Sequence, residues 1–309
     1  MVVHRMFQRL LSKVRPVSLR VCSSEYLRFT WKMNTSATEP LTSAQELSVE
    51  IGGLPITLRA TDANFLALIE SRYSNYLRAP VETSFAFDVE VRPDHLLPPD
   101  DDGENELRVW LEGGQWRFER GDFRACMDPA ARTGRILQSV SPYAIDSVLR
   151  IVHTLIQASQ GGFLLHGASA IRNGRAFLFS GVSGAGKTTI SRLAPPDAIL
   201  LTDEISYVRR QGDRYLACGT PFAGELARPG ENAMAPIEHL YFLSKGLDNR
   251  TDPIAPADAL RMLLRNILFF AEDAELVKMV FRSATEFLGR VPFSRLTFYP
   301  DQRVWDLIQ

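Results

Sequence analysis

Apolar and polar residues alternate along much of the stretch from about residue 45 to residue 140. In residues 85–91 every second position is apolar, which is the period of a strand with one buried face. Parts of the stretches 107–111 and 116–118 alternate in the same way, and Gly113-Gly114 between them predicts a hairpin turn. We therefore expect a β-rich region here.

The apolar pattern predicts two helices, one within this region and one that ends it. The first helix carries an apolar stripe and ends before Pro80; the stripe is formed by Phe65, Leu66, Ile69, Tyr73, Tyr76 and Leu77. A second helix begins after Ser141, an N-cap residue, with Pro142 in the first helical position and Gly161-Gly162 at its end. The pattern divides the chain into an accessory β-rich region, residues 45–140, and a second half, residues 141–309.

The second half opens with two apolar stretches, Phe163–Ile171 and Ala176–Ser180, joined through Asn173-Gly174. Asn-Gly is the strongest short-range signal for a type I′ hairpin turn. The strand Ala176–Ser180 therefore has an antiparallel neighbour just before it in the chain. In an all-parallel sheet helical crossovers would separate these strands, so we expect a mixed sheet.

The remaining elements follow from apolar runs and their breakers. A short helix after residue 188 is stopped by Pro195-Pro196, and a strand follows at 198–201. The other expected elements are a buried strand around Leu240–Leu243, helices at 258–270 and 273–288 with Gly289 at C′, and strands at 293–299 and 304–308.

Composition and charge narrow the function classes. The 309 residues include 35 Lys/Arg and 36 Asp/Glu, so no strong field would attract nucleic acid or an acidic membrane. Three widely spaced cysteines predict neither disulfides nor a zinc site, which favours the cytoplasm. Residues 1–32 hold seven basic residues and one acid, and we expect 1–44 to be a disordered basic extension, with an organellar transit peptide as the alternative. The acidic run 98–106 is expected to be a solvated loop.

Residues 181–188 match the phosphate-loop pattern G-x-x-x-x-G-K-[ST] in full. The glycines let backbone N–H groups converge on phosphate oxygens, the following helix adds its dipole, and Lys187 supplies a movable charge. The hydroxyl of Thr188 is placed to hold Mg²⁺ between phosphates. The residues expected to bind the nucleotide are Gly181, Val182, Ser183, Gly184, Ala185, Gly186, Lys187, Thr188 and Thr189.

Asp203 and Glu204 follow the apolar strand that ends near Leu201. Two adjacent carboxylates at a strand end, with a phosphate loop only 16 residues upstream of Asp203, suit metal coordination and general-base chemistry. The alternative is a solvated strand end.

The ordered set of His166-Gly167, a hairpin, the phosphate loop and Asp203-Glu204 resembles the C-terminal catalytic domain of the bacterial HPr kinase/phosphorylase family. The resemblance covers roughly residues 160–305. The fold of that family is akin to that of phosphoenolpyruvate carboxykinase. The resemblance thus implies an α/β fold, a mixed-sheet P-loop domain of that type, here preceded by a smaller β-rich N-terminal region.

The resemblance also implies roles for individual residues. Asp203 is the base toward a serine hydroxyl, His166 lies in the active site, and Lys187 and Thr188 bind ATP and Mg²⁺. Glu204 matches the second acid, on the metal side. Glu225 is a third candidate metal ligand, with an ordinary surface acid as the equal alternative, and Arg228 and Arg265 are candidates for stabilising transition-state charge.

The sequence departs from the family at one signature. True HPr kinases read approximately L-E-[IV]-R-G where this chain has Gly219–Glu225, so HPr itself is a doubtful acceptor. We expect a cytoplasmic ATP- and Mg²⁺-dependent kinase that acts on a hydroxyl, most simply a serine, of a protein or peptide. No nucleic-acid or membrane partner is expected, and family members often form homo-oligomers. The alternatives are a small-molecule kinase and a non-catalytic, nucleotide-gated regulator.

Overall fold

The computed structural model describes residues 44–79, 85–93, 107–271 and 273–308. The expected basic extension, apart from Ala44, and the expected acidic loop 98–106 lie outside the described residues. Gln45–Gln309 form one compact unit of mixed α/β structure with two mixed sheets, and the N-terminal part is β-rich, as the alternating pattern predicts.

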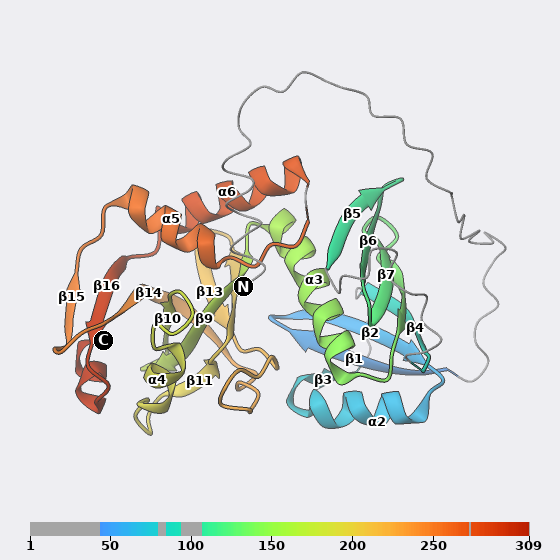
Figure 1. Cartoon of the computed structure of the whole chain (residues 1–309), viewed down its shortest axis with the longest axis horizontal. Coiled ribbons are helices and arrows are strands. Elements are labelled where there is room, and N and C mark those ends of the chain that lie inside the picture. The colour runs from blue at the N-terminus through green and yellow to red at the C-terminus, as the bar shows by residue number, and fades with distance from the viewer. Residues whose placement is uncertain (1–43, 80–84, 94–106, 272, 309) are drawn as a thin grey trace, which may run out of the picture. The chain divides into compact units, whose positions relative to one another are not determined.

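The first sheet belongs to the N-terminal part (Figure 1). Its strands are, in spatial order, β3 (Leu77–Arg78), β1 (Gln45–Ile51), β2 (Leu54–Ala60), β4 (Phe85–Val91), β8 (Thr133–Gln138), β7 (Phe123–Asp128), β6 (Gln115–Arg120) and β5 (Arg108–Glu112). The pairs β2–β4 and β4–β8 are parallel, and the others are antiparallel. In β4 the buried residues alternate, which confirms the predicted period of two.

The second sheet belongs to the C-terminal part. Its strands are, in spatial order, β10 (Arg175–Ser180), β9 (Phe163–Arg172), β12 (Ile205–Gln211), β13 (Arg214–Cys218), β14 (Met234–Lys245), β16 (Phe293–Phe298) and β15 (Arg250–Asp252), with β11 (Ile199–Thr202) paired to β9. β10 is antiparallel to β9 and parallel to β14, so the predicted mixed sheet is confirmed. The turn between β9 and β10 has positive φ at Asn173 and Gly174, as a type I′ turn requires.

The helices are α2 (Ala63–Arg72), α3 (Pro142–Gln160), α4 (Lys187–Arg192), α5 (Pro256–Asn266) and α6 (Ala274–Leu288), with 3₁₀ turns η1 (Ser74–Tyr76) and η3 (Gln302–Leu307). α3 lies between the two sheets (Figure 1). It begins and ends as predicted, because the Ser141 hydroxyl accepts a hydrogen bond from the Tyr143 N–H and Gly161 is left-handed at its C-cap. None of the helices within the described ranges is long and apolar enough to cross a membrane.

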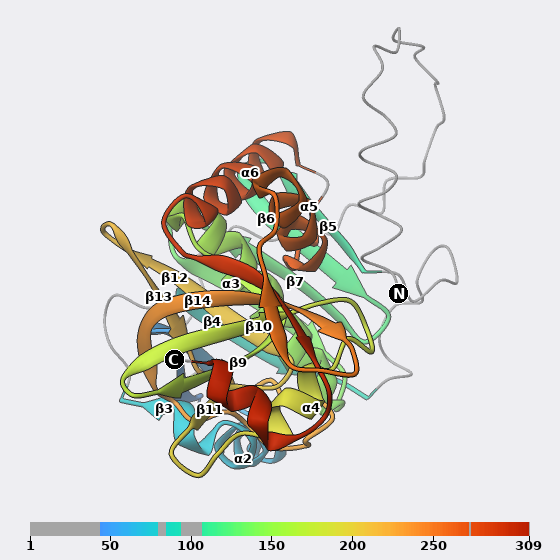
Figure 2. The ribbon, with the colours of Figure 1, turned by 90° about the vertical axis from the view of Figure 1, so that its left-hand side faces the viewer.

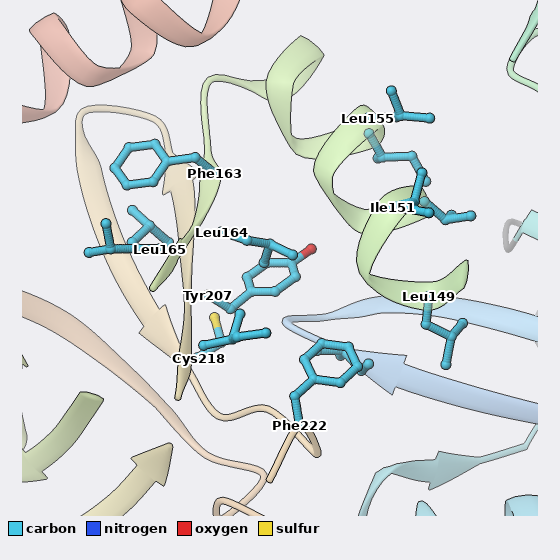
Figure 3. Close-up of a cluster of buried hydrophobic side chains, with 14 of the residues drawn as sticks. Leu149, Ile151, Leu155, Phe163, Leu164, Leu165, Tyr207, Cys218 and Phe222 are labelled. Atoms are coloured by element: carbon cyan, nitrogen blue, oxygen red, sulfur yellow. The ribbon is translucent and has the colours of Figure 1, made fainter. Parts of the chain in front are cut away.

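A continuous apolar core joins α3 to both sheets. Leu149, Ile151 and Leu155 of α3 belong to the same buried cluster as Phe163, Leu164 and Leu165 of β9 (Figure 3). A second core cluster lies around α4, and Figure 2 shows η3 next to that helix. The indole N–H of Trp305 in η3 donates to the Ile190 carbonyl, which fixes the C-terminal segment against α4.

Three expectations about element boundaries are wrong. The first helix ends at Arg72 rather than near Pro80. Tyr73 is the N-cap residue of η1 and Tyr76 lies within η1, where its hydroxyl donates to the Gly230 carbonyl. The helix expected at 258–270 ends at Asn266, whereas Gly289 lies at the end of α6 as expected, as its C-cap residue with φ −73°. Residues 304–307 lie in η3 instead of a strand, and Ile308 is the C-cap residue of that turn; the Asp301 carboxylate caps its start by accepting from the Arg303 N–H.

The buried imidazole of His153 in α3 predicts how stability changes with pH. Burial lowers the pKa of His153 from 6.5 to about 3, and its Nδ1 lies 3.2 Å from the Tyr207 hydroxyl. Between these two pKa values the unfolded chain binds a proton that the folded chain does not, so stability falls as the pH falls. We expect the loss between pH 8 and pH 5 to be smaller in His153→Gln than in the wild type by about 2 kcal/mol, measured by urea unfolding. Equal losses in both proteins would contradict this.

Candidate functional site

The glycine-rich segment Gly181–Gly186 connects β10 directly to α4, so the strand and the helix that the phosphate-loop pattern demands are both present. Gly184 and Gly186 have φ values of 78° and 109°, a region that other residues rarely adopt. Ser183 and Gly184 are exposed at the tip of the loop. The backbone of the loop is therefore turned in the way that a phosphate cradle requires.

Lys187 is buried at the start of α4. Its ammonium group donates hydrogen bonds to the carbonyls of Gly181 and Val182, at 3.1 and 3.2 Å. Burial lowers the pKa of Lys187, while the carboxylates of Glu204 and Glu225 act in the opposite direction. Lys187 thus donates to two loop carbonyls, a role that phosphate oxygens could take over. The charges of two predicted acids, Glu204 and Glu225, act on its ammonium group.

The two positive-φ glycines offer a matched test of the loop. A Cβ on Gly186 would lie 2.6 Å from Cζ of the buried Phe298, whereas a Cβ on Gly184 would meet no atom within 4 Å. We expect Gly186→Ala to lower the free energy of unfolding by about 2–4 kcal/mol, from backbone strain plus overpacking, and Gly184→Ala by about 1–2 kcal/mol, from strain alone. Urea unfolding measures both. Equal costs for the two variants would mean that the packing under Gly186 is not tight.

Strand β9 brings the acidic pair to the phosphate loop. On one side Gly167 of β9 pairs with Ser180, the last residue before the loop. On the other side His166 pairs with Ile205, and the Gly167 N–H donates to the Glu204 carbonyl at 3.0 Å. A Cβ on Gly167 would lie 2.9 Å from the Phe179 carbonyl oxygen, so this close approach requires glycine. The three motifs found in the sequence, which are His166-Gly167, the phosphate loop and the acidic pair, are therefore brought together by one strand, β9.

Asp203 is almost fully buried, and backbone N–H groups orient both oxygens of its carboxylate. One oxygen accepts from the Gly224 N–H at 3.1 Å and the other from the Leu226 N–H at 2.9 Å. A Cβ on Gly224 would lie 2.8 Å from an Asp203 carboxylate oxygen. Asp203 thus anchors the loop that carries Glu225, in addition to any role toward a substrate.

Glu204 and His166 form the more open part of the site. Nδ1 of His166 lies 3.5 Å from a Glu204 carboxylate oxygen, and both side chains are about one third exposed. Burial, together with the nearby Lys187 charge, lowers the pKa of His166 to about 4. Burial raises the pKa of Glu204, against the effect of Lys187. A neutral imidazole therefore stands beside a carboxylate whose charge a nearby cation would stabilise.

Of the remaining predicted residues, three lie near the site and two are not tied to it. Thr188 and Thr189 are half-buried in the first turn of α4. Glu225 is exposed, and its charge acts on both Lys187 and Glu204. Arg228 and Arg265 are exposed, and no hydrogen bond or ion pair between described residues joins either one to the acidic pair.

Mg²⁺ is the ion that the resemblance implies, and the residues fit it. Among the described residues, no three His, Cys, Asp or Glu side chains cluster as a metal cage. Mg²⁺ bound to a nucleotide is commonly held by one or two carboxylates together with phosphate oxygens, so such a cage is not needed. Glu204, whose charged form is penalised by burial, and the hydroxyl of Thr188 in the turn after the loop are donors of the right chemistry.

Arg150 is a cation of this site that the sequence pattern did not single out. Its guanidinium lies over the Phe222 ring, 4.8 Å from the centroid, and its Nε is buried without a hydrogen-bond partner among the described residues. Its charge also favours the ionised form of Glu204. The available signal was a charged residue between two apolar residues, Leu149 and Ile151, in the predicted helix. Periodicity alone could not show which other segment it faces.

Comparisons with known proteins bear on the second half of the chain. The family model of the SynChlorMet cassette protein ScmC matches residues 137–309. No curated protein matches the sequence. Among solved structures, the Hpr(Ser) kinase/phosphatase from Coxiella burnetii is similar with a TM-score of 0.28 and 11% sequence identity, over 47% of this chain and 85% of that one. The residues matched by the family model include the whole site, from Arg150 to Glu225.

Proposed function

The chain belongs to the family of the SynChlorMet cassette protein ScmC, and we propose that it is a kinase that transfers the γ-phosphoryl group of ATP to a hydroxyl group. One observation carries this proposal. A complete phosphate-loop sequence and an acidic pair lie on the two sides of β9, close enough for Lys187 and Glu204 to influence each other's ionisation. A phosphate held by that loop would have its far end directed at two carboxylates.

The protein's own groups would do most of the work by positioning. The loop N–H groups and Lys187 hold the phosphates, with Lys187 exchanging its present carbonyl partners for phosphate oxygens. Asp203, oriented by two backbone N–H groups, accepts the proton of the acceptor hydroxyl. A bond forms between that oxygen and the γ-phosphorus as the bond from phosphorus to the bridging oxygen breaks, and ADP leaves.

Thr188 and Glu204 would hold Mg²⁺, which spreads the charge of the phosphates when bound. Glu225 lies on the loop that Asp203 anchors, and its charge acts on Glu204, so its carboxylate could be a further Mg²⁺ ligand. His166 stays neutral at physiological pH, because its pKa is about 4, and can orient Glu204 by a hydrogen bond without competing for the cation. The positive charge of Arg150 favours the ionised form of Glu204.

A serine of a protein or peptide is the acceptor we propose, on the resemblance of the site motifs to HPr kinases. The departure at Gly219–Glu225 argues against HPr itself. The test is incubation with Mg²⁺ and ATP labelled in the γ position, together with proteins and peptides encoded near the gene. We expect label on one of them, lost in Lys187→Ala. Label on a metabolite alone would favour a small-molecule kinase, and nucleotide binding without any transfer would favour a nucleotide-gated regulator.

A further inference from the structure

The position of the acidic pair sets the direction in which a nucleotide must lie. Asp203 and Glu204 are on the β9 side of the phosphate loop. A triphosphate whose terminal phosphoryl group reacts near these carboxylates runs away from them toward its nucleoside. The nucleoside therefore leaves the loop on the opposite side of β10, where β14 and then β16 are the next strands.

These strands end at the same edge of the sheet as β10, because β10, β14 and β16 are mutually parallel. Lys245 of β14 pairs with Phe298 of β16, so the residues that follow each strand are neighbours. Two of these residues are large, apolar and exposed, Leu247 at 93% and Tyr299 at 48%. We call them the Leu247/Tyr299 surface.

The end of β16 is in direct contact with the phosphate loop. The ring of Phe298 packs so closely under Gly186 that a Cβ there would be 2.6 Å from its Cζ. Phe298 itself is buried in the core cluster around α4. Tyr299 directly follows this residue in the chain, so the Leu247/Tyr299 surface begins next to the segment that packs against the loop.

Hydrogen bonds hold the two exposed segments together before any ligand binds. The Asn249 side-chain oxygen accepts from the Tyr299 N–H at 2.9 Å, and its amide group donates to Asp301 at 3.4 Å. The Gly246 N–H also donates to the Phe298 carbonyl at 3.1 Å. A surface built in this way loses little freedom when it binds a flat ligand.

The acids and arginines of these two segments are already paired with one another. Arg250 is paired with Asp248 and Asp252, and Arg303 is paired with Asp301. A neutral, flat, partly apolar group fits such surroundings better than a further phosphate does. Aromatic side chains commonly bind bases by stacking on their faces.

We propose that the Leu247/Tyr299 surface binds the base of the nucleotide, with Tyr299 stacked on the base and Leu247 in apolar contact with it. This inference rests on the proposed function, since it takes the phosphates to be in the Gly181–Thr188 loop. Both side-chain groups of Asn249 are used within the protein, so base recognition by this surface depends on stacking.

Binding of two ligands by calorimetry, each with Mg²⁺, tests the inference. ATP has a base and inorganic tripolyphosphate has none. We expect Tyr299→Ala to weaken ATP binding about tenfold and to leave tripolyphosphate binding within twofold of the wild type. Tyr299→Phe keeps the ring and should bind ATP as the wild type does. Phe281→Ala, which removes an aromatic side chain of similar exposure (52%) on α6, should change neither affinity.

The outcomes separate the two proposals. If the wild type binds tripolyphosphate and ATP, but Tyr299→Ala weakens both equally or neither, the base site is wrong and the phosphate site stands. Equal affinity of the wild type for the two ligands would likewise overturn the base site alone. If the wild type binds neither ligand, the proposed function fails, and the base site fails with it.

Discussion

Asp203→Asn is expected to lower the rate of phosphoryl transfer by about 10²–10⁴-fold, while ATP affinity stays within a few-fold of the wild type. The reason is that asparagine keeps the shape of the side chain but cannot accept the proton of the acceptor hydroxyl. Transfer to the acceptor and calorimetric binding of ATP measure the two quantities separately. A regulator that only binds nucleotide would instead keep its biological activity in this variant.

Asp203 has a second task, so a fall in rate alone does not identify a base. Its carboxylate accepts hydrogen bonds from the Gly224 and Leu226 N–H groups, and asparagine would place an amide N–H against one of these donors. The pH dependence of kcat/KM separates the two tasks. Loss of a base removes the acidic limb of the profile, whereas a displaced loop lowers the rate at every pH. An unchanged acidic limb in Asp203→Asn would assign Asp203 to loop anchoring only.

Glu204→Gln is the control for Asp203→Asn, because it makes the same carboxylate-to-amide change at the neighbouring acid. Glu204 is adjacent to Asp203, but its carboxylate is more exposed and accepts no backbone N–H in the described structure. If it holds Mg²⁺, Glu204→Gln raises the Mg²⁺ concentration needed for half-maximal transfer and leaves the acidic limb in place. If the acidic limb is lost in Glu204→Gln instead, the two acids have exchanged roles.

Local signals in the sequence were sufficient for most of the elements that build this site. The cap residues of α3, the Asn173-Gly174 turn and the glycines of the phosphate loop each act through a few neighbouring residues, so their patterns are readable without a structure. The same signals predicted that His166 lies on the strand next to the loop, and β9 confirms it.

Contacts between distant segments were not readable in the same way. The 3₁₀ turn at 302–307 depends on Trp305 reaching Ile190, 115 residues earlier, and the end of α2 depends on Tyr73 and Tyr76 reaching later segments. Arg150 faces Phe222, 72 positions away, for which periodicity offers no signal. The division of the chain into accessory and catalytic domains, the acceptor and the oligomeric state stay predictions.

Lys187→Met is expected to remove most ATP binding and to lower transfer by at least about 10²-fold, as loss of one preorganised charged donor does in other active sites. Methionine keeps the length and apolar stem of lysine but has no charge for the phosphates. Calorimetry with ATP and with tripolyphosphate should show the loss for both ligands, since Lys187 contacts the phosphates and not the base. Normal ATP affinity in this variant would overturn the phosphate site.

The same variant should leave the free protein nearly as stable as the wild type. Lys187 is buried without an ion pair among the described residues, and its lowered pKa shows that burial opposes its charge. A buried charge of this kind can often be replaced by an apolar residue of similar volume at little cost. We expect the free energy of unfolding of Lys187→Met to lie within about 1 kcal/mol of the wild type, because the two lost hydrogen bonds are offset by the desolvation penalty removed. An unchanged free energy of unfolding would mean that the charge of Lys187 serves ligand binding rather than the fold. A large loss of stability would instead assign Lys187 to holding the loop.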